Sequence, residues 1–364
     1  MCEVASSETA LPGDRVSSID VARHAGVSQS AVSRTFTPGA SVGAATRAKV
    51  MRAAQALGYE PNALARSLIT GRSRIIGLVV SQLDNLFYPA VLEHLSQRLQ
   101  ADGFHLLMFV ADDTDSDALV EKMLQYRVDG IVLGAVTLSS ALAQRCTAAG
   151  IPVVLFNRVM ARRRGSPAVS SVRGDNVRGG RLLAQHLLER GHSRIAFIAG
   201  REDSSTNLER ERGFIQGLAQ GSQHLFARAV GGYDADQAAE ATRALFRSRR
   251  KAPDAVFAAS DQMALAVIDT LRHQLSVRVP EEVSVVGFDN VPQSCWPAYQ
   301  LTTFEQPVAP MVEATVALLL EQIRSGALRS QSLIVRGQLC VRVTTRMRTR
   351  ASSNRLAQPT DPRS

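Results

Sequence analysis

The sequence predicts a small all-α N-terminal head followed by two α/β lobes with parallel sheets. Two short amphipathic helices with a glycine turn between them occupy residues 17–36. From residue 74 onward, short continuous apolar segments alternate with amphipathic segments of helical length, which is typical of parallel sheets covered on both faces. The chain has 364 residues, too many for one ordinary core, so we expect two or three domains.

The first two helices form a helix-turn-helix pattern. Ser17 and Asp20 have the spacing of a capping box, Gly26 can take the positive φ that ends a helix, and Ser28 is placed to cap the second helix. The outer face of that second helix is polar and carries Gln29, Ser30, Ser33 and Arg34. Amide, hydroxyl and guanidinium groups on one exposed face suit the major groove of DNA, whereas a merely solvated face would look the same in isolation.

A third helix and an excess of positive charge strengthen the DNA-binding interpretation. Pro38-Gly39 marks a turn, and the segment Thr46–Leu57 has helical apolar spacing, which completes a compact unit over residues 15–60. Between Arg15 and Arg72 the eight basic residues outnumber the two acidic ones, within a chain of net charge +9. Such a segment is suited to phosphate contacts.

Residues 61–73 are expected to form a hinge segment between the head and the lobes. Asn62 is a good N-cap, Leu64 and Leu68 stand four residues apart, and Gly71 ends the pattern. A helix this short is unstable alone in water. It is either a linker packed on its own domain or a segment that becomes ordered on DNA, with leucine inserted into the minor groove as a wedge.

The remainder, residues 74–346, is expected to be a two-lobed effector-binding domain. In the first half, strands are predicted at Ile75–Val80, His105–Ala111, Gly130–Val136 and Pro152–Asn157, with helices at Pro89–Ala101 and near Asp117–Tyr126. In the second half, helices are predicted from Asn176 to Arg190, around Glu209–Gln220, from Gln262 to about Leu275 and at Val308–Arg324. Strands are predicted there at Arg194–Gly200, Ala255–Ser260, Val283–Asp289, Leu301–Pro307, Leu333–Arg336 and Leu339–Val343.

The remaining features of the sequence exclude several classes of protein. Residues 1–14 and 347–364 are expected to be disordered, and the N-terminus lacks the pattern of a secretory signal, so we expect a cytoplasmic protein. No apolar run reaches the length of a membrane span. The four cysteines are scattered without metal-ligand spacing, so we expect reduced thiols, no metal site and no cofactor.

The ordered series of motifs resembles the LacI/GalR family of bacterial transcription regulators over about residues 16–346. The motifs are DVARHAGVSQSAVSR, GYEPNALARSL, RSRIIGLVV, GHSRIAFIAG, SDQMALAVI, VSVVGFDN and LTTFEQP. The resemblance implies a homodimer that binds a pseudo-palindromic operator in double-stranded DNA, and a periplasmic-binding-protein-like sensor that closes on a small molecule. It places Ser28, Gln29, Ser30, Ser33 and Arg34 in the major groove and Asn62, Ala65 and Leu68 in the hinge segment that meets the minor groove.

The same resemblance implies a set of effector-binding residues in the sensor. They are Asn85, Phe87, Asn157, Arg210, Tyr233, Ser260, Asp261, Asp289 and Gln306. Ligands of open α/β sheets bind beyond the carboxyl ends of the strands, which is where Asn157, Ser260 and Asp289 stand. Alternative roles are helix capping for Asp261, a turn for Asp289 and a surface ion pair for Arg210.

The sequence therefore favours a transcriptional repressor under allosteric control by a small molecule, most simply a sugar or sugar derivative. A purine or a phosphorylated metabolite is the alternative effector, and either induction or corepression fits the same scheme. An enzyme is the competing class, but neither a phosphate-binding GxxxxGK[ST] loop nor a GxGxxG or GxSxG motif after a strand is present. A transport-type binding protein is disfavoured by the basic helical head.

Overall fold

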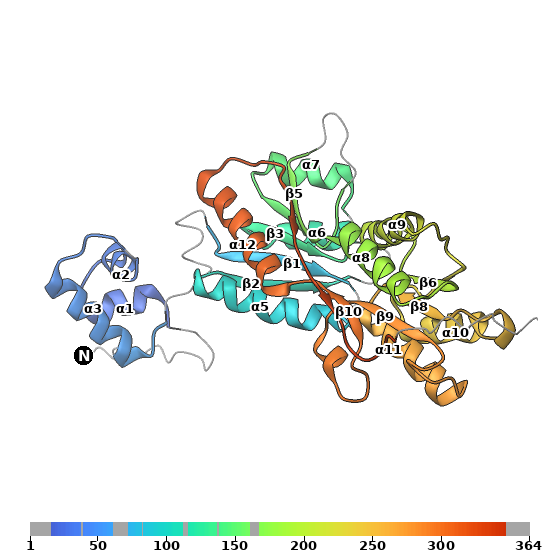
Figure 1. Cartoon of the computed structure of the whole chain (residues 1–364). Coiled ribbons are helices and arrows are strands. Elements are labelled where there is room, and N and C mark those ends of the chain that lie inside the picture. The colour runs from blue at the N-terminus through green and yellow to red at the C-terminus, as the bar shows by residue number, and fades with distance from the viewer. Residues whose placement is uncertain are drawn as a thin grey trace, which may run out of the picture. The chain divides into compact units, whose positions relative to one another are not determined.

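The computed structural model describes residues 16–37, 39–60, 72–81, 83–111, 116–136, 138–160 and 167–346. The chain divides into two compact units, Met1–Ser73 and Arg74–Ser364 (Figure 1). The expected disordered segments at 1–14 and 347–364, and most of the hinge segment, lie outside the described residues. No helix in the described part of the chain is long and apolar enough to cross a bilayer.

The head contains three helices, α1 (Ser18–Ala25), α2 (Gln29–Thr35) and α3 (Ala44–Leu57). The capping box forms as expected, since the Asp20 amide donates to Ser17 Oγ and the Ser17 amide donates to Asp20 Oδ2. Gly26 ends α1 with φ 64°. α3 begins two residues before the predicted Thr46, because Ala44 and Ala45 are strong helix formers and Gly43 has a cap conformation without a side-chain bond. The small core is Val21, Ala22, Val32, Val50, Ala53 and Ala54.

The first lobe is built on a six-stranded, fully parallel sheet of order β11-β5-β4-β3-β1-β2 (Figure 1). Its strands are β1 (Ile75–Val80), β2 (His105–Val110), β3 (Gly130–Gly134), β4 (Val153–Phe156), β5 (Val169–Gly174) and β11 (Ser332–Val335). Helices α5 (Phe87–Ala101) and α12 (Val308–Ser325) pack on one face, and α6 (Ser116–Leu124) and α7 (Ser140–Ala148) on the other. Burial on both faces explains why the central strands β1, β3 and β4 are apolar along their whole length.

The second lobe repeats the architecture with the strand order β12-β10-β9-β8-β6-β7. Its strands are β6 (Ile195–Ala199), β7 (Ala227–Val230), β8 (Ala255–Ala258), β9 (Ser284–Asp289), β10 (Thr302–Glu305) and β12 (Leu339–Cys340). Its helices are α8 (Asn176–Glu189), α9 (Ser205–Gln220), α10 (Ala235–Leu245) and α11 (Asp261–Asp269), with helical turns at Arg249–Lys251, Thr270–Gln274 and Pro292–Cys295. Only β12 runs antiparallel to its neighbour.

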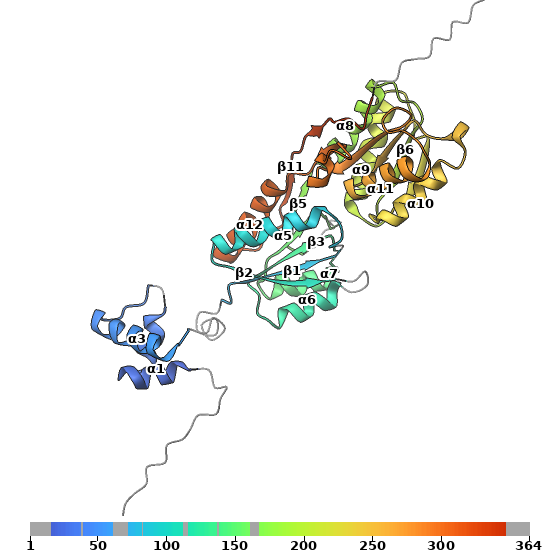
Figure 2. The ribbon, with the colours of Figure 1, turned by 90° about the horizontal axis from the view of Figure 1, so that it is seen from below.

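The chain passes between the two lobes three times, and the three crossings lie together (Figure 2). They follow β5, β10 and β11. The Asp175 amide donates to Val335 O at 3.1 Å and the Glu305 amide donates to Gln338 O at 2.8 Å, which joins the third crossing to the other two. At Gly337 a Cβ atom would lie 1.9 Å from Glu305 O, so only glycine permits this approach. The lobes are therefore connected by a bundle of three strands of chain.

Four elements were absent from the sequence prediction, namely α7, β5, β7 and α10. β5 is interrupted by Ser170 and Ser171, whose hydroxyls are satisfied by Arg329 O and Ser332 Oγ, so an apolar pattern does not reveal it. β7 is a four-residue edge strand with alternating exposure. The helix predicted around Glu209–Gln220 begins earlier, at Ser205.

Candidate functional site

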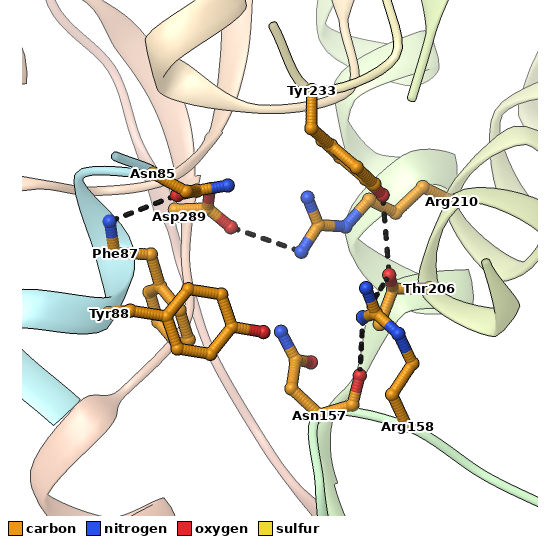
Figure 3. Close-up of a pocket in the computed structure, with 9 residues that line it drawn as sticks. All are labelled: Asn85, Phe87, Tyr88, Asn157, Arg158, Thr206, Arg210, Tyr233 and Asp289. Carbon is orange, nitrogen blue, oxygen red and sulfur yellow. Dashed lines mark hydrogen bonds and ion pairs between the residues drawn. The ribbon is translucent and has the colours of Figure 1, made fainter. Parts of the chain in front are cut away.

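A cavity of about 260 Å³, partly open to solvent, lies between the two lobes. Residues of both lobes line it (Figure 3). The lining residues are Asn85, Phe87, Tyr88, Asn157, Arg158, Thr206, Arg210, Tyr233 and Asp289. The set offers amide, carboxylate and guanidinium groups next to three aromatic rings, as in a small-molecule site.

Arg210 is held in place in the cavity by hydrogen bonds, an ion pair and an aromatic contact. Its Nη2 donates to Asp289 Oδ1 at 3.0 Å and its Nε donates to Asn176 Oδ1 at 3.1 Å. A further bond runs from Nη1 to Ala259 O, and the guanidinium carbon lies 3.8 Å from the centre of the Phe288 ring. Both charged side chains of the pair are 3% exposed, so the ion pair is fully desolvated and its geometry is fixed on every side.

The aromatic residues supply flat apolar surface to the cavity. Phe87 and Tyr88 begin α5 and meet edge to face, with ring centroids 5.5 Å apart. Tyr233 lies across from them on the second lobe, and its hydroxyl is 3.2 Å from Thr206 Oγ1. Gly200 makes room for this ring, since a Cβ atom there would lie 2.3 Å from Tyr233 Cζ. Rings of this kind stack on the apolar faces of planar or ring-shaped ligands.

Three residues that line the cavity have a backbone conformation with positive φ. Asn157, Tyr233 and Asp289 have φ values of 56°, 66° and 126° although none is glycine. Such conformations cost free energy and persist where the surrounding structure enforces them, which is common at ligand sites. The buried Asn157 Oδ1 has no hydrogen-bond partner within the described residues, so it is available to a ligand donor.

Two buried carboxylates lie at the second-lobe side of the cavity. Burial raises the pKa of Asp289, and the Arg210 guanidinium acts against this rise. Burial, together with the neighbouring Asp289 charge, raises the pKa of Asp261 to about 7. Asp261 is bound within the protein, because Thr303 Oγ1 donates to its Oδ1 at 2.5 Å and the Val291 amide donates to its Oδ2 at 2.9 Å.

The exposed face of α2 is the candidate nucleic-acid interface. Ser28, Gln29, Ser30 and Arg34 are exposed, and Ser33 is partly exposed. Ser28 caps the helix through the Ala31 amide, and Arg34 Nε donates to Ser30 O at 3.3 Å, which holds the guanidinium along the helix. On the opposite side Ala31, Val32 and Thr35 are buried in the head. The polar residues therefore project together from one rigid helix.

Comparisons with known proteins match both units. The lacI family of bacterial regulatory proteins matches residues 19–62, and a periplasmic binding protein-like domain matches residues 184–345. The HTH-type transcriptional regulator CelR of Thermobifida fusca is 34% identical over 332 residues, covering 88% of this chain and 96% of that protein. This chain belongs to the LacI family. It is accordingly a DNA-binding transcription regulator of that family.

Other relatives of this LacI-family chain agree. The HTH-type transcriptional repressor PurR of Vibrio vulnificus (strain CMCP6) is 31% identical over 337 residues, covering 90% of this chain and 98% of that protein. The lac repressor dimer bound to operator and the anti-inducer ONPF has 27% identity and a TM-score of 0.81, covering 92% of this chain and 100% of that one. The CelR–cellobiose complex has 31% identity and a TM-score of 0.68, covering 91% and 100%.

Six of the nine effector residues predicted for this LacI-family chain line the cavity. They are Asn85, Phe87, Asn157, Arg210, Tyr233 and Asp289. Ser260 and Asp261 do not line it: Ser260 caps α11 through the Met263 amide, and Asp261 is bound as described above. Gln306 is not among the lining residues either, and its Nε2 donates to Asp289 Oδ1 at 2.6 Å.

Tyr88, Arg158 and Thr206 line the cavity although they were not predicted as effector residues. Tyr88 directly follows Phe87, and Arg158 directly follows Asn157. Their position next to two predicted effector residues could have identified them. Thr206 was hidden because the predicted start of its helix was too late. The hinge residues Asn62, Ala65 and Leu68 lie outside the described residues. Within the described part of this LacI-family chain, no group of three His, Cys, Asp or Glu side chains could hold a metal ion.

Proposed function

We propose that the chain is a repressor that binds a pseudo-palindromic operator as a homodimer and is controlled by a sugar or sugar derivative in the interlobe cavity. The observation that carries the proposal is the cavity itself, where aromatic faces stand beside paired donors and acceptors on both lobes. Hydroxyl groups of a sugar both donate and accept, so they suit Asn85, Asn157 and Asp289. The relative CelR was solved in complex with cellobiose, which agrees with this class of effector.

On the DNA side, the proposal assigns base reading to α2. Glutamine suits adenine and arginine suits guanine, because each pair forms two hydrogen bonds in the major groove. Ser28 and Ser30 supply hydroxyl groups at the exposed start of the helix, and Ser33 lies one turn further. In the hinge segment we assign minor-groove contacts to Asn62 and Ala65 and the wedge to Leu68, on the resemblance to the family's motifs.

The operator proposal is tested by mobility-shift titration with DNA from upstream of the protein's own gene. Arg34→Ala should weaken binding by about 1–3 kcal/mol and reduce the preference for the operator over unrelated DNA. Gln55→Ala, at an exposed position of α3, is the matched control and should bind as the parent does. Equal preference in the Arg34 variant and the parent would show that Arg34 reads no base.

The effector proposal is tested by thermal shift with neutral sugars, sugar acids, sugar phosphates and purines. A ligand that binds the folded protein raises its melting temperature, and the true effector must also change operator affinity in the titration above. Stabilisation by a purine and by no carbohydrate would contradict the proposed effector class and leave the operator proposal intact.

A further inference from the structure

We propose that the effector carries an anionic group, a carboxylate or a phosphate on a sugar, and that Arg158 and the N-terminal end of α9 bind it. This inference rests on the proposed function, in which the interlobe cavity holds a sugar-type effector. It narrows the class of effector to sugars that carry a negatively charged group.

Arg158 is buried in the cavity beside neutral partners. The residue is only 6% exposed and lines the cavity. Its Nη1 donates to Asn157 O at 2.8 Å and to Thr206 Oγ1 at 3.0 Å, and both of these oxygens are neutral (Figure 3). Among the residues that the structure describes, no carboxylate forms an ion pair with it. A buried charge without a counter-charge is costly, since most of its hydration has been removed.

Arg210 provides the contrast within the same cavity. It is 2% exposed, and its charge is compensated by Asp289, with further bonds to Asn176 and Ala259. Asp289 is thus already engaged by Arg210 and by Gln306. Two arginines and one carboxylate line the cavity, so the surplus positive charge belongs to Arg158.

The second, independent feature is the start of α9, a helix of sixteen residues. Its N-cap, Ser204, makes no side-chain cap bond, because its hydroxyl lies 2.8 Å from Thr206 Oγ1. The first-turn amides of a helix have no partner within the helix and carry partial positive charge. Thr206, in this first turn, contacts Arg158 directly, so helix end and guanidinium favour an anion at the same place.

The acidic residue closest in sequence to this helix end is occupied elsewhere. Asp203 is bound by Arg201, whose Nε and Nη2 donate to its two carboxylate oxygens at 3.3 Å each. Its side chain is 67% exposed and therefore solvated. The hydrogen bond from Arg201 lowers the pKa of Asp203, and the charge of Arg158 adds a smaller effect in the same direction without forming an ion pair. The aromatic rings and Asn85 remain for the sugar ring, and the anionic substituent is left for Arg158.

The test is ligand binding to the whole chain with matched compounds: glucose, glucuronate and glucose 6-phosphate, and the corresponding galactose series. At least one acid or phosphate should raise the melting temperature more than its neutral sugar does. The carboxylate and phosphate arms distinguish the two sources of the charge. Equal or stronger stabilisation by the neutral sugars would overturn the inference while leaving the proposed function in place; failure of every anionic compound would overturn it as well.

A variant separates binding from folding. Arg158→Gln should lower the affinity for the stabilising anion about 10- to 100-fold, as expected for a lost charge-assisted hydrogen bond. It should lower the affinity for the matched neutral sugar by a smaller factor, because a hydroxyl group forms no charge-assisted hydrogen bond with the guanidinium. Arg212→Gln, exposed on α9, is the control for general electrostatics and should keep the anion preference.

The melting temperature without ligand gives a second readout. Removal of an uncompensated buried charge should leave it unchanged or raise it in Arg158→Gln. A fall in the melting temperature together with an unchanged anion preference would show that the protein itself satisfies Arg158, and would overturn the inference.

Discussion

Buried ionisable groups in the second lobe are accommodated in different ways. Arg210 and Asp289 show one solution, in which the guanidinium meets a carboxylate, two neutral oxygens and an aromatic face. His186 on α8 shows another. It is 4% exposed, and its Nε2 lies 2.9 Å from Thr345 Oγ1. Burial, reinforced by the charges of Arg190 and His192, lowers the pKa of His186 to about 4.

This lowered pKa predicts a pH dependence of stability. The unfolded chain binds a proton at His186 below about pH 6.5, while the folded chain does not until about pH 4, so stability should fall as the pH drops through this window. Relative to His186→Gln, the parent should lose about 3 kcal/mol of unfolding free energy between pH 7 and pH 4. Urea unfolding followed by Trp296, the chain's single tryptophan, measures it.

The control for this experiment is His224→Gln, because His224 is exposed. That variant should follow the pH dependence of the parent. If His186→Gln also kept the full slope of the parent, another group would be responsible for the acid sensitivity.

At the residue scale, the sequence predicted the cavity where a side chain directly follows a strand or begins a helix. Asn157 and Asp289 could be placed in this way because parallel strands end at one edge of the sheet. The sequence could not show whether Asp261 binds a ligand or the protein itself. Its hydrogen bonds come from Thr303 and from the Val291 amide, which are distant in sequence. The role of Arg158 could not be predicted from the sequence, because the neutral partners that leave its charge uncompensated are visible only in the structure.

At the element scale, helices α8 and α9 pack backbone to backbone and thereby position Arg210. A Cβ atom on Gly213 would lie 2.0 Å from Val177 O, and one on Gly180 would lie 2.2 Å from Arg210 O. Only glycine allows this approach. The contact also brings Asn176, the first residue of α8, against both Arg210 and Glu209. The close packing of two helices is thus what aims the guanidinium at the cavity.

Gly213→Ala should therefore force the two helices apart. We expect a loss of about 1–3 kcal/mol in unfolding free energy from overpacking, with weaker effector binding because Arg210 shifts. Urea unfolding and sugar titration measure the two effects. Gln216→Ala, on the exposed face of α9, is the control and should change neither quantity. If Gly213→Ala had the same unfolding free energy as the parent, the two helices could move apart without cost and the prediction would be wrong.

The elements themselves were predictable where burial is uniform and unpredictable where polar groups are satisfied over long distances. β1, β3, β4 and β9 are buried along nearly their whole length and read as apolar runs. β5 contains serines whose partners lie about 160 residues later, in the segment around β11. Local sequence holds no trace of such partners, so the strand was missed.

At the scale of the whole molecule, the lobes were expected from the alternation of strands and helices, but their composition was not. α12 and β11 come late in the chain and complete the first lobe, while β12 returns to the second. The apolar pattern of residues Leu333–Arg336 predicts a strand but does not indicate which of the two sheets this strand joins. The pairing is decided by β5, whose register places Ser332 opposite Ser171 and Val335 opposite Gly174.

The proposed regulation predicts how a substitution in the hinge segment changes the binding of the whole chain to DNA. Leu68→Ala should reduce operator bending and weaken operator binding by about 1.5–3 kcal/mol, the contribution of burying one leucine side chain. The melting temperature of the sensor should not change, because the substitution lies in the hinge segment. Circular-permutation mobility shifts measure the bending, and equal bending by variant and parent would remove the wedge role from Leu68.

The threefold crossing also determines the order in which the molecule can be made. During synthesis, the central strands of the first lobe leave the ribosome early, but its outermost strand, Ser332–Val335, emerges only after nearly all of the second lobe. The first lobe must therefore wait, with the edge of β5 uncovered, until residues 332–335 have been made. Any premature stop before residue 332 would leave that edge open to pairing with other chains.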